Sequence, residues 1–150
     1  MKKIDSFLNE VERKEVADFI QSLEQKTSGE IRVAVRFNRG FFEKKKSVHE
    51  LALKEFHRLK MDKTRDKTGV LLFILVDDRE FHIAADEGID KKVEEKTWEN
   101  IANELTAFFK EGKIKDGILH VLKKSGEILS QHFPKKSDDT NELSNEVSFH

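Results

Sequence analysis

The amino-acid sequence predicts an α/β sandwich, in which a small mixed sheet is flanked by helices. Val70–Val76 is an uninterrupted apolar run, typical of a central strand covered on both faces. Ile31–Phe37 alternates between apolar and other residues, as a strand does when one face is buried. Four further segments carry apolar residues at helical spacing. The predicted order is α-β-α-β-β-α-α.

The helices are predicted from apolar residues that recur with the period of an α-helix. They span Asn9–Lys26, Glu43–Lys60, Asp90–Lys110 and Asp116–Phe133. In the first helix the stripe consists of Val16, Phe19, Ile20 and Leu23. Asn9 followed by Glu12 resembles a capping box, and Pro134 bars continuation of the last helix.

Two strands are predicted beside the central one. Phe81–Ala85 follows the turn residues Asp77–Arg79, so it forms a hairpin with Val70–Val76. Ile31–Phe37 precedes a helix, so it pairs with the central strand in parallel through a right-handed crossover. Its arginines, Arg32 and Arg36, favour a position near an edge or under a partly open face.

Composition restricts the classes of protein to consider. The chain has 150 residues and suits one domain; we assign 1–134 to it and expect 135–150 to be a disordered polar tail. It holds no cysteine, which excludes disulfides and thiolate metal sites. A net charge of −1 argues against a nucleic-acid partner. We see neither a signal peptide nor a membrane span, so we expect a cytoplasmic protein, most simply a monomer.

Acidic residues should gather at one end of the sheet. Because the hairpin returns the chain, its far end lies beside the start of the central strand, where the parallel strand also starts. The acids expected there are Glu30, Asp62, Asp66, Asp86 and Asp90, with Glu94 one helical turn further on. Hard cations take oxygen ligands, and flexible loops favour Ca²⁺ over Mg²⁺. The alternative is that these acids only solvate loops, balanced by interleaved lysines, with Asp90 as a helix N-cap.

Two other features allow more than one interpretation. Asp77 and Asp78 at the opposite end could handle a cation or phosphate, but an Asp-rich turn is more often only a turn. Phe41–Phe42 followed by lysines could be a membrane-surface anchor. The favoured interpretation is that these aromatic rings pack inward. His82 is expected on an outward, solvated strand face.

Several segments together resemble the TPM domain family. They are Thr27–Val33, Thr68–Ile74, Asp78–Arg79, Ile83–Ile89, Trp98, Gly112, Asp116–Ile118 and His132–Pro134. The resemblance implies an α/β sandwich, a divalent-cation site and, as attributed to some plant members, acid phosphatase activity. Many relatives have a glycine-tyrosine-glycine-leucine-glutamate loop, whereas this sequence has Asp86–Asp90.

Three functions are consistent with these observations. The first is a calcium-binding module with a regulatory or protein quality-control role. The second is a phosphomonoesterase that uses metal-bound water, with Asp86 or Asp66 as ligand or base, because no nucleophile motif is present. The third is an interaction domain without metal.

Overall fold

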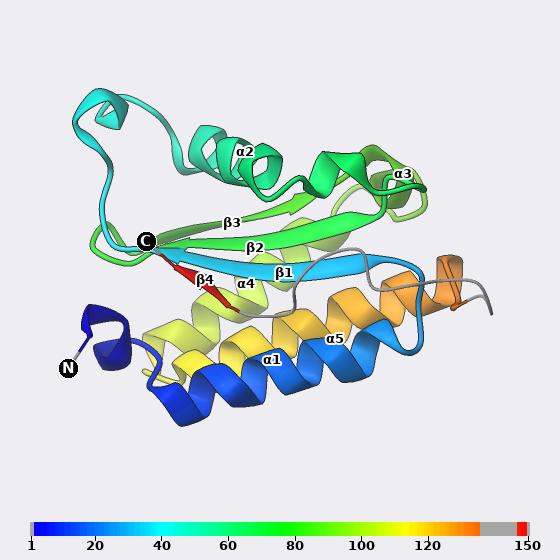
Figure 1. The fold of residues 1–150 in the computed structure, drawn as a ribbon, viewed down its shortest axis with the longest axis horizontal. Helices are drawn as coiled ribbons and strands as arrows, with labels where there is room; N and C mark the ends of the chain where they lie inside the picture. The colour runs from blue at the N-terminus through cyan, green and yellow to red at the C-terminus, as the bar shows by residue number, and fades with distance from the viewer. Residues whose placement is uncertain (1, 136–146, 150) are drawn as a thin grey trace.

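The computed structural model describes residues 2–135 and 147–149. Its sheet has the strand order β3-β2-β1-β4 (Figure 1). The strands are β1 (Glu30–Arg36), β2 (Gly69–Leu75), β3 (Glu80–Ala85) and the short β4 (Ser148–Phe149). As predicted, β1 and β2 are parallel, and β2 and β3 form an antiparallel hairpin. The α/β class and the central strand are therefore confirmed.

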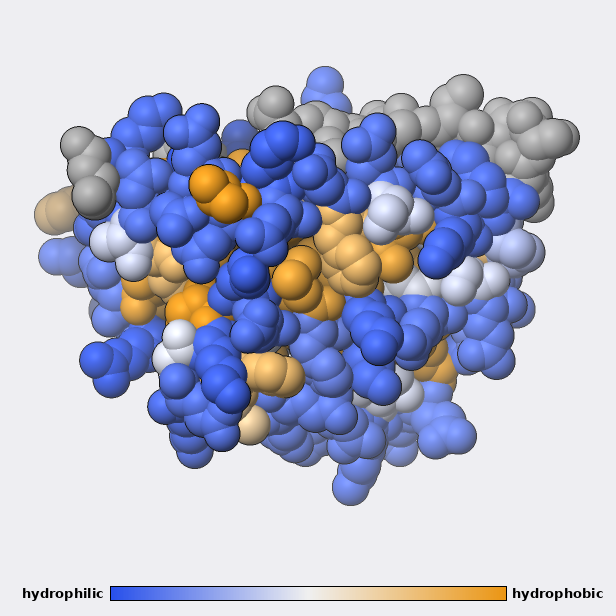
Figure 2. Space-filling view, turned by 90° about the horizontal axis from the view of Figure 1, so that it is seen from below, coloured by the Kyte–Doolittle hydropathy of each residue, from blue (hydrophilic) through white to orange (hydrophobic). Residues whose placement is uncertain are grey.

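Helices cover both faces of the sheet (Figure 1). They are α1 (Glu10–Glu24), α2 (Val48–Arg58), α3 (Glu87–Asp90), α4 (Thr97–Lys110) and α5 (Ile114–His132), with 3-10 turns η1 (Lys3–Ser6), η2 (Phe41–Glu43) and η3 (Met61–Lys63). Helix α2 lies on one face, and α1, α4 and α5 lie on the other. Seen from the side of α1 and α5, the surface is mostly hydrophilic, with apolar residues showing only in patches (Figure 2).

The period of the strands divides the core into two layers. On β2, Leu71 and Phe73 face α2 with Ala34 of β1, whereas Leu72 and Ile74 face the three-helix layer. Both sets are buried, which is why β2 shows no polar residue along its length. The continuous apolar run of β2 and the presence of helices on both faces of the sheet thus have one physical cause, the burial of both faces of this strand.

The structure departs most from the predicted boundaries in two helices, the second and the third. The second helix begins at Val48 rather than Glu43, because Ser47 accepts a hydrogen bond from the Glu50 amide and caps it. The third is divided into α3 and α4, with Lys91–Lys96 between them. The lysine- and glutamate-rich segment between them lacks the apolar stripe that would hold a continuous helix on the sheet.

The chain end also differs from the prediction. Ser148 and Phe149, expected in a disordered tail, pair in parallel with Ala34 and Val35 of β1. Residues 136–146 and 150 of that tail lie outside the described residues. Among the described helices, none is long and apolar enough to cross a bilayer.

Candidate functional site

The site begins with a row of three residues across the start of the sheet. Glu30 of β1 is in register with Gly69 of β2, whose carbonyl accepts a hydrogen bond of 2.9 Å from the Asp86 amide. Gly69 has no side chain between the two acids, and a Cβ there would lie 3.2 Å from the Met61 carbonyl and from the Phe56 ring. Glu30 and Asp86 are therefore placed at the same end of the sheet, as predicted.

The loop before β2 packs directly on α3. A Cβ on Gly88 would lie 2.2 Å from the Asp66 carbonyl oxygen and 2.4 Å from that of Lys67. Only glycine allows this backbone contact. It brings the Asp66 and Asp86 loops together, although they are distant in sequence.

Asp86 uses one carboxylate oxygen in the fold and leaves the other unused. Its Oδ1 accepts a hydrogen bond of 2.8 Å from the Glu87 amide and caps α3. Its Oδ2 is buried and has no hydrogen-bond partner among the described residues. A buried oxygen of this kind calls for a partner, which a cation, a proton or a water molecule could supply. Asp90 follows on α3, where its amide donates to the Asp86 carbonyl.

Two of the other predicted ligands, Asp62 and Asp66, have local partners instead. Asp62 pairs with His57 at 3.2 Å, and Asp66 pairs with Arg65 at 3.3 Å. Burial acts to raise the pKa of Asp62, but its hydrogen bonds to His57 and to backbone outweigh this and hold the pKa below its usual value. In 2–135 and 147–149, no three acidic or histidine side chains are arranged to hold a metal. The loops meet, but their carboxylates do not converge.

Sequence reasoning missed a buried acidic pair at the same end. Glu24 ends α1 and is 6% exposed, beside Glu30, which is 2% exposed. Burial, followed by the hydrogen-bonding contact with Glu30, raises the pKa of Glu24 to about 9. The signal was available, because Glu24 lies four residues after Ile20 and so on the buried stripe of the helix.

The opposite end of the sheet is held by ion pairs. Arg39 binds Asp78 and also Glu80, the latter at 3.0 Å, and Lys3 lies 3.6 Å from Asp77. These contacts tie the hairpin turn to the chain after β1 and to η1. Asp77 and Asp78 therefore have structural partners.

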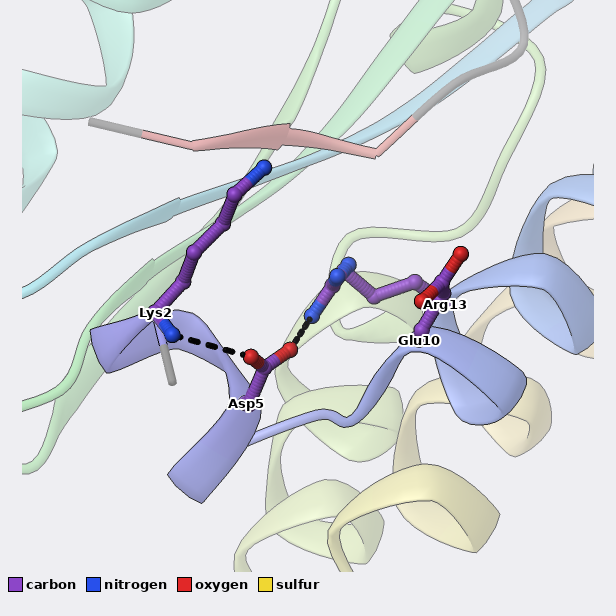
Figure 3. Close-up of a pocket in the computed structure, with 4 residues that line it drawn as sticks. All are labelled: Lys2, Asp5, Glu10 and Arg13. Carbon is purple, nitrogen blue, oxygen red and sulfur yellow. Dashed lines mark hydrogen bonds and ion pairs between the residues drawn. The ribbon is translucent and has the colours of Figure 1, made fainter.

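Two cavities lie towards that end. A polar one of about 520 Å³ is lined by Lys2, Asp5, Glu10 and Arg13 (Figure 3). Within it, Asp5 accepts from the Lys2 amide and from Arg13, so these groups join η1 to α1. A second, mainly apolar groove of about 700 Å³ lies between the β2–β3 hairpin and α4, with Phe81 and Phe109 among its lining. Neither contains the predicted ligands.

Comparison with known proteins identifies the family. A family model of the TPM domain matches residues 3–128. The BA42 protein of the psychrophilic bacterium Bizionia argentinensis, solved by NMR, is 37% identical, covers 100% of each chain and superposes with a TM-score of 0.86. The N-terminal domain of a P. gingivalis protein, also solved by NMR, shares the fold at 14% identity, covering 87% of this chain and 83% of that one, with a TM-score of 0.68. No curated protein matches. The chain belongs to the TPM domain family.

Proposed function

We propose that this chain binds a divalent cation where the Asp66 loop lies against α3, with Ca²⁺ favoured over Mg²⁺. The observation that carries the proposal is Asp86 Oδ2, which is buried and without a hydrogen-bond partner among the described residues. Hard cations take carboxylate and carbonyl oxygens, and this junction offers both types. The oxygens present therefore fit such a cation in their chemistry.

Binding would require the loops to adjust. Asp66 would exchange its contact with Arg65 for the cation, and Asp90, on α3, would approach from the other side. Calcium tolerates irregular sets of six to eight oxygens, whereas magnesium demands octahedral geometry. A site assembled from two loops and a short helix suits the more tolerant ion. Glu30 and Asp62 complete the proposed set from β1 and η3.

A cation that draws these loops together would change the surface they present, and this supports a regulatory or quality-control role rather than a chemical step. A metal-assisted phosphomonoesterase would depend on the same cation. Hydrolysis of p-nitrophenyl phosphate that disappears in Asp86→Asn would favour that second function. Activity that survives the substitution would have another source.

The experiment is a calcium titration followed through backbone amide NMR shifts. We expect Asp66, Asp86 and Asp90 to shift at millimolar calcium, with at least about tenfold weaker binding in Asp86→Asn. Asparagine is also a good N-cap, so this variant keeps α3 while removing the charge. Asp18→Asn is the control, because Asp18 is exposed on α1, where it pairs with Lys14. Unchanged shifts in the wild type would end the proposal.

A further inference from the structure

The 3-10 turn η2 presents two aromatic rings to solvent. Phe41 is 77% exposed and Phe42 is 92% exposed, and their rings meet edge to face at 5.1 Å. The prediction that these rings pack inward is wrong. Water-exposed rings that are adjacent in sequence and in space form an apolar patch, and such patches mark interaction sites.

The turn is held in place from beneath by a buried acid. The Glu43 carboxylate, 7% exposed, accepts from Arg36 of β1, from Lys54 of α2 at 2.8 Å and from the Gly40 amide at 2.9 Å. This network joins η2 to the sheet and to α2. The exposure of the two rings is therefore built into the fold.

The segment is also fixed at its far end. Arg39 Nε donates to the Lys46 carbonyl at 2.8 Å, while the same guanidinium binds Asp78 and Glu80. Residues Gly40–Lys46, which we call the Phe-Lys tip, thus leave and rejoin the body at one anchored point. In Figure 1 the segment containing η2 stands out beyond the start of α2, at the end of the sheet away from α3.

The charge of the tip is positive. Lys44, Lys45 and Lys46 are exposed, and Lys44 Nζ lies 5.3 Å from the centre of the Phe41 ring. The acid of the segment, Glu43, is buried and matched by Arg36 and Lys54. The next acid along the chain, Glu50, lies in the first turn of α2. The rings therefore protrude beside three exposed lysines for which the described residues provide no ion pair.

We propose that the Phe-Lys tip docks on the surface of a lipid bilayer that carries anionic headgroups. Phenylalanine rings gain free energy when they enter the boundary between headgroups and acyl chains. Lysines beside them are attracted by the negative surface potential, roughly fivefold in affinity for each lysine near the surface. Apolar and cationic groups at one projecting point satisfy both requirements together.

The shape of the tip favours a bilayer over a protein partner. The two rings protrude from a short turn, and neither of the two cavities described above is lined by them. A bilayer deforms around protruding groups, whereas a folded partner would need a matching pocket. One tip would give weak, reversible attachment, since a small apolar anchor needs a second, electrostatic signal to bind stably.

The test is co-sedimentation of the full chain with vesicles. One set is pure phosphatidylcholine, and the other contains about a quarter phosphatidylglycerol. We expect binding to the anionic vesicles alone, weakened when salt rises from about 0.1 M to about 0.5 M, because the Debye length shortens. Phe41→Ser with Phe42→Ser, and separately the three Lys→Gln substitutions at 44–46, should each reduce binding at least about tenfold.

Val11→Ser is the matched control. Val11 is 69% exposed on α1, so the variant removes a solvent-facing apolar side chain elsewhere and should bind vesicles like the wild type. All the changed residues are exposed, so each variant should fold, and circular dichroism spectra of the variants check this. Equal vesicle binding by wild type and the double Phe variant would overturn the proposal. A second result would also overturn it: the wild type forms a dimer, the double Phe variant is a monomer, and neither binds vesicles. The tip would then join two copies of the chain.

Discussion

His49 Nδ1 on α2 lies 2.9 Å from His82 Nε2 on β3, and the two rings meet edge to face at 4.5 Å between centroids. At this distance one ring donates its N–H to the lone pair of the other, which requires that the accepting ring be neutral. The pair joins α2 to the outer strand of the hairpin. His82 therefore faces α2 rather than solvent, contrary to the sequence prediction.

This pair predicts a loss of stability in acid. Burial, followed by the nearby His49, lowers the pKa of His82 below 6.5 in the folded protein. A base with a lowered folded-state pKa binds fewer protons in the native state, so stability is full above pH 6.5 and falls as pH drops through that value. The free energy of unfolding in urea should differ less between pH 7.5 and pH 5.5 in His82→Gln than in the wild type. The control His132→Gln, which changes a histidine at the end of α5, should keep the wild-type difference. If both variants behave alike, the pair does not titrate as argued.

Glu24 predicts the opposite pH dependence. Its pKa is raised to about 9, so the stability it contributes is full below pH 4.5 and is lost as pH rises through 9. At pH 7 the folded state carries a proton that the unfolded state lacks, and one pKa unit corresponds to about 1.4 kcal/mol. Glu24→Gln should therefore raise the free energy of unfolding at pH 7 by about 2 kcal/mol, with little gain at pH 4. Calorimetry at pH 7 and pH 4 measures the change in stability, with the surface variant Glu15→Gln as control. An equal change at both pH values would contradict the prediction.

Gly88 predicts a steric requirement at the candidate site. A Cβ at this position collides with the backbone carbonyls of Asp66 and Lys67, which cannot rotate away as a side chain would. Gly88→Ala should cost about 2–4 kcal/mol of stability and weaken any calcium binding. The comparison is Gly112→Ala, which has a φ of 73° and no atom within 4 Å, so it should cost only about 1 kcal/mol of backbone strain. Thermal unfolding compares the stability of the two variants. Equal losses would mean that the backbone around α3 shifts readily to make room for the added methyl group.

Glu43 predicts that the base of the Phe-Lys tip stabilises the fold. Its hydrogen bonds with Arg36 and Lys54 hold its pKa well below the usual range, so its stabilising effect is full above pH 4.5 and is lost as pH falls. Glu43→Ala leaves Arg36 without this partner and should cost about 2–3 kcal/mol. Lys54→Ala should cost less than about 1 kcal/mol, since that side chain is 62% exposed. Denaturant unfolding of both variants measures the two losses of stability. A larger loss in Lys54→Ala than in Glu43→Ala would contradict the stabilising role given to Glu43.

The candidate site was only partly predictable. That Glu30 and Asp86 share one end of the sheet follows from a hairpin returning beside a parallel strand, and the register confirms it. The partners of Asp62 and Asp66 could not be read from the sequence, because side-chain orientation depends on neighbouring loops. Whether these residues bind a cation stays a prediction.

The sequence by itself determined strands β1, β2 and β3, their parallel and antiparallel pairings and the two-sided burial of β2. These follow from hydrophobic period and turn chemistry, which act over a few residues. Only the tertiary structure decided that the buried Glu24 meets Glu30, that Gly88 packs against the carbonyls of another loop, and that Phe41 and Phe42 stay in water. Such outcomes depend on which segments, distant in sequence, come into contact, and the local sequence pattern does not predict those contacts.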